Sequence, residues 1–213
     1  MKRRDFSLAL AGLGLSAVGG VRAQAAKPRE GKDYAVLDKR VSTEAPQGAI
    51  EVIEFFSYNC PHCAEFEPLL ATWAKQQPKD VTLRRVPVAF IGDFEVKQRM
   101  YYALEAMGKV DEYQIKVFNA IHRQRQNLAG EAATLDWVQK QGLDKDKFAE
   151  LFRSFSVASK VRRATQLQDA FRVEGVPALG IAGRYYTDGT MAGGVTRALQ
   201  VADHLIAQAR KTA

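Results

Sequence analysis

The chain has 213 residues and a formal net charge of +7 at pH 7, with 46% hydrophobic and 26% charged residues. These proportions are ordinary for a globular domain, and this length can bury a core without disulfide staples. With only two cysteines, a disulfide-rich scaffold is excluded. Residues 1–25 carry a net +3, so the rest carries a mild +4, which gives no reason to expect a nucleic-acid partner.

The N-terminus has the three parts of an export signal. Residues 2–4 are basic, residues 6–20 are apolar, and the small residues Ala23 and Ala25 suit cleavage. We therefore predict a signal peptide over residues 1–25, cleaved near Ala23 or Ala25, and export to an oxidising compartment. An uncleaved anchor is less favoured because the apolar segment is short. Residues 3–6 also resemble the twin-arginine signal, although Ser7 and Leu8 match it imperfectly, so the export route stays open.

Strand and helix patterns alternate in the first part of the chain. We predict strands at residues 34–37, 49–56 and 81–88, and an amphipathic helix at residues 61–77 that Pro78 ends. The strand at 49–56 is apolar on both faces, as in a buried central strand, with Glu54 as the exception. We expect Glu54 to be buried, and Arg84 and Arg85 to be solvated charges.

A long helical block follows, with no strand candidate between residues 88 and 174. We predict helices at 94–107, 113–123 and 135–141, and helical structure from 145 to about 171. Thr134 and Asp144 are suitable N-caps for the last two of these. The spacing of Phe148, Phe152 and Phe155 predicts that all three belong to the core.

The C-terminal part returns to a mixed pattern. It predicts a turn at 175–177, a short strand at 178–181, a hairpin into Tyr185 and Tyr186, a loop at 189–194 and a helix at 195–210. The fold class is therefore α/β. We predict one sheet-containing unit from residues 26–93 and 173–213, interrupted by an all-α insertion at residues 94–172.

Cys60 and Cys63 lie where a predicted strand is followed by a helix. At a helix N-terminus, free backbone N–H groups and the helix dipole stabilise an anion such as a thiolate. Pro61 suits the first helical position, and His62 can add positive charge. Each effect lowers the pKa of Cys60, so we predict Cys60 as the nucleophile and Cys63 as the resolving thiol. Stabilising the thiolate also makes the disulfide a stronger oxidant.

Three other uses of the cysteine pair are less favoured but stay open. A zinc site needs about four ligands, and His122 and His204 lie at no metal-like spacing, so we predict no metal; we expect both histidines at helix surfaces. A purely structural disulfide across two residues would constrain little chain. A cysteine hydrolase would have no need of a second cysteine at this spacing.

Residues 54–63, with the sequence EFFSYNCPHC, strongly resemble the active-site segment of the DsbA family, thiol:disulfide interchange proteins of the bacterial periplasm. Residues 175–178, GVPA, resemble that family's cis-proline loop. The resemblance covers essentially the whole chain after residue 25. It implies a thioredoxin fold with an inserted all-α helical domain, a periplasmic location, and a redox-active Cys60–Cys63 disulfide in place of any separate cofactor.

The resemblance also implies roles for residues outside the cysteine motif. Val176 and Pro177 would share a cis peptide bond beside the disulfide and bind an extended substrate segment. Glu54 would be a buried acid beneath the disulfide that helps proton movement. The implied partners are unfolded or folding exported proteins with free thiols and a membrane reoxidase of DsbB type, and we expect a monomer.

Our leading hypothesis is an exported oxidase that passes its Cys60–Cys63 disulfide to reduced proteins through a mixed disulfide at Cys60. An isomerase or reductase on the same fold is the second hypothesis, although too few residues precede the strand at 49–56 for an added dimerisation domain. The third is a non-catalytic binding module such as a holdase, which the presence of both cysteines disfavours.

Overall fold

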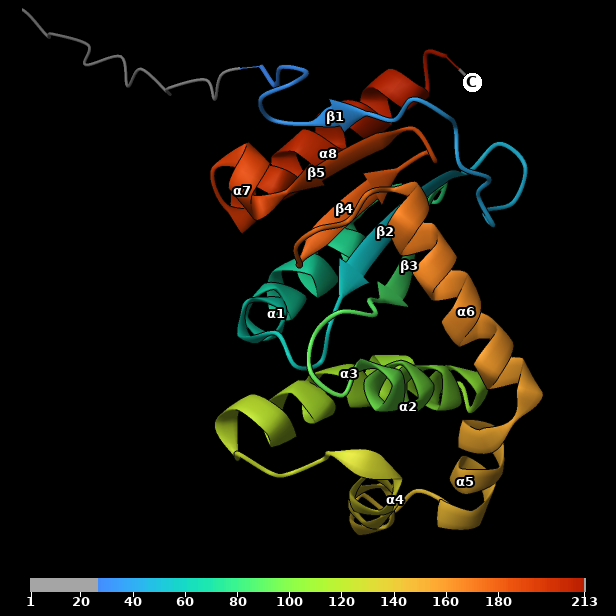
Figure 1. The fold of residues 1–213 in the computed structure, drawn as a ribbon. Helices are drawn as coiled ribbons and strands as arrows, with labels where there is room; N and C mark the ends of the chain where they lie inside the picture. Colours follow the sequence, from blue (N-terminus) through green and yellow to red (C-terminus); the bar gives the residue numbers. More distant parts are fainter. Residues whose placement is uncertain (1–26, 213) are drawn as a thin grey trace, which may run out of the picture.

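The computed structural model describes residues 27–212, drawn in colour in Figure 1. The predicted signal peptide at 1–25 lies outside the described residues. Within residues 27–212, no helix combines the length and apolar character needed to cross a membrane.

A five-stranded mixed sheet forms the centre of the fold. Its strands are β1 (Ala35–Val36), β2 (Ile50–Phe56), β3 (Val81–Pro87), β4 (Ala178–Ile181) and β5 (Tyr185–Asp188), in the spatial order β1-β5-β4-β2-β3. Strand β2 runs parallel to β3 and antiparallel to β4. All seven residues of β2 are buried, which confirms the prediction of a central strand.

Helices cover both faces of the sheet, and successive side chains of β2 point to opposite faces. Val52 packs in one core with α1 (Pro61–Gln76) and α8 (Val195–Ala209). Phe55 packs in a second core on the other face, where its ring lies 5.2 Å from that of Phe171 at the end of α6 (Phe155–Ala170). In Figure 1, α1 and α6 lie on opposite sides of the sheet.

The helical block between β3 and β4 packs against one end of the sheet (Figure 1). It consists of α2 (Phe94–Ala106), α3 (Val110–Phe118), the π-helical segment η1 (Asn119–Arg123), α4 (Gly130–Lys140), α5 (Lys145–Arg153) and α6. No strand interrupts it, as predicted. The ring of Phe56 in β2 lies 5.3 Å from Tyr101 of α2 and 6.1 Å from Phe118 of α3, so the block and the sheet share one core.

The predicted cap at Thr134 is wrong. Helix α4 begins at Gly130, four residues before Thr134, so Thr134 lies inside the helix. Its hydroxyl donates to the Gly130 carbonyl 2.9 Å away. The predicted cap at Asp144 is confirmed, since its carboxylate accepts a hydrogen bond from the Lys147 N–H at 2.9 Å. Both residue types cap helices, but a threonine can also bond back to a carbonyl inside a helix.

The prediction that Phe155 belongs to the core is also wrong, because its exposed fraction is 81% while Phe148 and Phe152 are buried. Helix α5 (Lys145–Arg153) ends just before Ser154, and the Ser154 side chain caps α6 by accepting a hydrogen bond from the Val157 N–H. The helical spacing therefore does not continue across this position. A smaller difference lies at residues 189–194, where the short helix α7 (Gly189–Ala192) occupies part of the expected loop.

Candidate active site

The two cysteines lie at the start of α1, as the sequence predicts. Cys60 is the N-cap residue, Pro61 takes the first helical position, and Cys63 lies in the first turn. Both side chains carry free thiols and are buried, with exposed fractions of 6% for Cys60 and 0% for Cys63. The Cys60 N–H donates to the Ser57 carbonyl at 3.0 Å and closes the turn between β2 and α1.

The two thiols differ strongly in acidity. The pKa of Cys60 is lowered to about 6, first by the hydrogen bond from the Cys63 thiol, against the effect of burial, and then by the backbone N–H groups of Cys63 and His62 and by the His62 side chain. Burial raises the pKa of Cys63, and its contacts with Cys60 and the nearby Glu54 raise it further. Near neutral pH, the site therefore holds one thiolate and one protonated thiol.

His62 itself is exposed on the surface beside Cys60. Its side chain is 75% exposed, and its Nδ1 lies 3.6 Å from the Glu65 carboxylate, which is equally open to solvent. Its contact with the site is therefore electrostatic and screened by water.

The loop at residues 175–178 reaches the cysteine pair from the other end of the chain. The Val176–Pro177 peptide bond is cis. The sulfur of Cys60 lies 3.4 Å from the Val176 carbonyl oxygen and donates a hydrogen bond to it when protonated. Pro177 is buried and leads directly into β4. The structure thus brings Val176 and Pro177 beside Cys60, as the resemblance implied.

Glu54 is completely buried on the face of β2 that α1 covers. Burial, followed by the charge of Glu67, raises its pKa to about 8, while Arg85 acts in the opposite direction. Arg85 Nε lies 3.2 Å from Glu54 Oε2, but neither carboxylate oxygen of Glu54 accepts a well-aligned hydrogen bond. One guanidinium therefore lies between two buried carboxyl groups, an arrangement that favours keeping a proton on one of them.

Glu54, Arg85 and Glu67 form a buried charge cluster. From the sequence, the position of Arg85 is misjudged and Glu67 is missed. Arg85 is not a solvated charge: its side chain is only 13% exposed and its Nη2 lies 2.6 Å from Glu67 Oε1. The parallel pairing of β2 with β3 places Arg85 opposite Glu54. Glu67 was not singled out, although its position four residues after Cys63 places both on the buried face of α1.

Arg84 is likewise paired rather than solvated. It lies on the opposite face of β3 from Arg85, and its Nε is 3.0 Å from Oε1 of the buried Glu51. Its Nη1 lies 3.1 Å from Glu44. Neighbouring arginines in one strand thus serve two separate clusters because successive side chains point to opposite faces.

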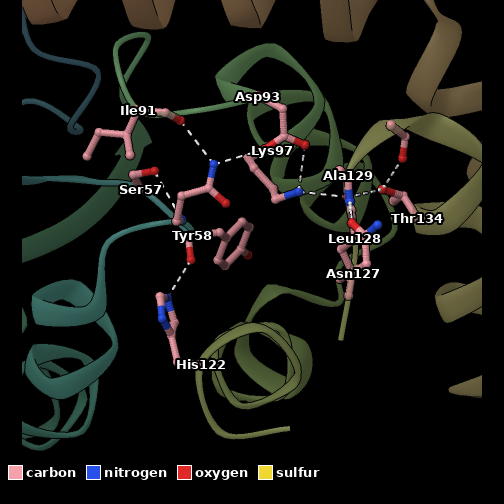
Figure 2. Close-up of polar contacts among 12 residues, drawn as sticks. Ser57, Tyr58, Ile91, Asp93, Lys97, His122, Asn127, Leu128, Ala129 and Thr134 are labelled. Carbon is pink, nitrogen blue, oxygen red and sulfur yellow. Dashed lines mark hydrogen bonds and ion pairs between the residues drawn. The ribbon is translucent and has the colours of Figure 1, made fainter. Parts of the chain in front are cut away.

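His122 is also more than a surface residue. Its half-buried ring donates from Nε2 to the Tyr58 carbonyl at 2.8 Å, two residues before Cys60 (Figure 2). The Tyr58 hydroxyl donates to Gln114 Oε1 at 2.6 Å. Both ends of Tyr58 are therefore held by the helical block.

A dithiol at a helix N-terminus, beside a cis-proline loop and above a buried acid, on a sheet of this order, defines a thiol:disulfide oxidoreductase of the thioredoxin fold. Within residues 27–212, no three histidine, cysteine or acidic side chains group closely enough to hold a metal ion.

Comparisons with known proteins agree with this class. Residues 85–205 match the family model described as a DSBA-like thioredoxin domain. The thiol:disulfide interchange protein DsbA of Bordetella parapertussis is 41% identical over 99% of this chain and 100% of its own, and that of Burkholderia cepacia is 39% identical over 97% of each. The crystal structure of Pseudomonas aeruginosa DsbA aligns with a TM-score of 0.83 at 36% identity, over 87% of this chain and 96% of that one. The chain belongs to the DsbA family of thiol:disulfide oxidoreductases.

Proposed function

We propose that the oxidised protein donates its Cys60–Cys63 disulfide to reduced exported proteins in the periplasm. The observation that carries this proposal is the position of Cys60 as the N-cap of α1, where the Cys63 thiol and the first backbone N–H groups stabilise its thiolate and lower its pKa, while burial raises the pKa of Cys63. A stabilised Cys60 thiolate favours the reduced form and so makes the disulfide a strong oxidant. Membership of the DsbA family implies that its substrates are proteins with free thiols.

The reaction proceeds in two exchanges. A substrate thiolate attacks the sulfur of Cys60, the Cys60–Cys63 bond breaks, and Cys63 leaves with the electron pair and takes up a proton. A second substrate thiolate then attacks the substrate sulfur of the mixed disulfide, and Cys60 leaves as a thiolate. The substrate dithiol is oxidised to a disulfide, and the protein disulfide is reduced.

Five residues from three segments of the chain assist these steps. Glu54, whose raised pKa of about 8 keeps it protonated at neutral pH, supplies the proton that Cys63 takes up on leaving. Val176 and Pro177 flank the sulfur of Cys60, so that an extended substrate segment can align its backbone there. Pro61 and His62 help to set the acidity of Cys60.

The remaining proposals follow from membership of the family. Residues 1–25 direct export and are removed near Ala23 or Ala25, and a membrane reoxidase of DsbB type restores the disulfide. The disulfide serves in place of a separate cofactor. The protein acts as a monomer in which a thioredoxin-like domain, 26–93 with 173–213, carries the helical domain 94–172.

The reduction potential, measured by equilibration with glutathione, tests this function. We expect a strongly oxidising value and rapid oxidation of a reduced multi-cysteine protein, both lost in Cys60→Ser. A value as low as that of a thioredoxin would contradict the proposal. Greater activity on scrambled than on reduced substrate would indicate an isomerase, and activity that survives replacement of both cysteines by serine would indicate a binding module.

A further inference from the structure

Asn59, the residue before Cys60, is held by the segment that leads into α2. Its side-chain Nδ2 donates to the Ile91 carbonyl at 3.0 Å and to Asp93 Oδ1 at 3.0 Å. Its backbone N–H donates to Ser57 Oγ at 3.1 Å. Both amide hydrogens of the side chain and the backbone N–H are thus engaged, which leaves this residue little freedom to rotate.

Asp93 in turn holds a buried lysine. Lys97 Nζ lies 2.9 Å from Asp93 Oδ2 and donates to the Leu128 carbonyl at 2.7 Å, and its side chain is only 4% exposed (Figure 2). An ammonium group is costly to bury unless it is paired and hydrogen-bonded. No step of the proposed disulfide exchange uses this lysine. The Asp93 carboxylate thus connects a buried cation of the helical block to the residue preceding Cys60.

The position of Cys60 matters because it caps α1. Hydrogen bonds to its sulfur come from the first backbone N–H groups of that helix and from Cys63, and such bonds weaken steeply when their angle changes. The turn that ends at Cys60 is closed by the bond from the Cys60 N–H to the Ser57 carbonyl. A shift of Asn59 would therefore move the sulfur relative to its donors.

We propose that Asp93 and Lys97 are positioning residues for the redox centre, which hold Asn59 and thereby fix the sulfur of Cys60 over the start of α1. The start of α2 then helps to set the reactivity of the cysteine pair through Asn59. This inference rests on the proposed role of Cys60 as the reactive sulfur.

The sign of the change in Asp93→Ala provides the test. The experiment measures the pKa of Cys60 in the reduced protein from the ultraviolet absorbance of its thiolate as a function of pH. Removing a negative charge near a thiolate would by itself lower that pKa. Loss of positioning instead raises it, by about half a unit or more, which corresponds to about threefold in the proton affinity of the sulfur.

Two further variants of the same contact separate position from charge. Asp93→Asn removes the charge but retains an oxygen that can accept a hydrogen bond from Asn59. We therefore expect the pKa of Cys60 in this variant to stay closer to its wild-type value. Asn59→Ala changes no charge, and we expect it to raise the pKa of Cys60. Asn59→Ala also gives the test should Asp93→Ala fail to fold.

A matched control lies on the same helix. Glu95 and Arg99 form an ion pair with the same four-residue spacing, at 3.0 Å, and Arg99 also donates to a backbone carbonyl, that of Phe152. Glu95→Ala should leave the pKa of Cys60 unchanged.

The last part of the test asks whether the effects of replacing Lys97 and Asn59 on the pKa of Cys60 depend on each other. If Lys97 acts through Asn59, Lys97→Met should raise the pKa of Cys60 in the wild type and add little in Asn59→Ala. A pKa that falls or stays unchanged in Asp93→Ala, or a full Lys97→Met effect in Asn59→Ala, would overturn the proposal. These comparisons concern the reduced protein only, so they remain readable if the reduction potential contradicts the oxidase function.

Discussion

The sulfur of Cys60 lies 3.4 Å from the Val176 carbonyl oxygen, to which it donates a hydrogen bond when it is protonated, although 116 positions separate the two residues. The contact joins the start of α1 to the loop before β4 at the end of the sheet where β2 gives way to α1. Together with Glu54 beneath the pair, it makes the candidate active site a product of three segments. The cysteine motif itself belongs to only one of them.

The acidity of Cys60 should depend on Cys63. The hydrogen bond from the Cys63 thiol is the largest cause of the lowered pKa, about 6, so Cys63→Ala should raise it. Cys63→Ser retains a hydroxyl donor at the same place and should raise it less. Thiolate absorbance measured against pH checks both. An unchanged pKa in Cys63→Ala would mean that the backbone donors suffice.

The same lowered pKa predicts how the stability of the reduced protein changes with pH. A group whose pKa is lower in the folded than in the unfolded state contributes stability above its unfolded pKa and loses it as pH falls through the folded value. The reduced form should therefore gain stability relative to the oxidised form as pH rises from about 6 toward 9. Urea unfolding of both forms measures this, and the oxidised form, which has no thiolate, is the internal control.

The raised pKa of Glu54 has the opposite effect on the pH dependence of stability. Its folded-state pKa of about 8 lies above its ordinary value of 4.5, so the stability associated with its proton is lost as pH rises through about 8. Glu54→Gln has no such loss and should match the wild type near pH 4 and exceed it at pH 8. Glu150→Gln, at a side chain that is 73% exposed, is the control. A gain equal at both pH values would contradict this explanation.

Arg85 should be far more important for stability than its surface counterparts. Arg85→Met leaves Glu54 and Glu67 buried without a counter-charge, and breaking a buried pair in this way costs about 3–5 kcal/mol in free energy of unfolding. Arg153→Met removes an exposed ion pair with Glu131 and should cost at most about 1 kcal/mol. Denaturant unfolding at pH 7 compares the two, and a small effect at Arg85 would argue against the charge cluster.

Phe148 and Phe155 should respond very differently to truncation. Phe148 is fully buried, and Phe148→Ala should cost about 3–5 kcal/mol in free energy of unfolding. Phe155 is 81% exposed, so Phe155→Ala should change that free energy by no more than about 0.5 kcal/mol. Thermal or urea unfolding measures both. Similar losses at the two positions would mean that Phe155 is covered in solution.

Much of the fold could be predicted because it follows from local patterns. A run that is apolar on both faces predicted the central strand, and Pro78 predicted the end of α1. Errors occurred where two local readings compete: Thr134 can cap a helix or lie inside one, and the single residue Ser154 interrupts an otherwise regular helical spacing. Such choices depend on what packs against each residue.

By itself, the sequence determined that two cysteines lie at the start of a helix, where free N–H groups favour a thiolate on Cys60. Tertiary structure alone decided which residues surround them. The register between β2 and β3 brought Arg85 to Glu54, and the packing of the helical block brought Asp93 to Asn59. These contacts join positions far apart in the chain, and a local pattern carries no information about which distant residue fills the space beside it.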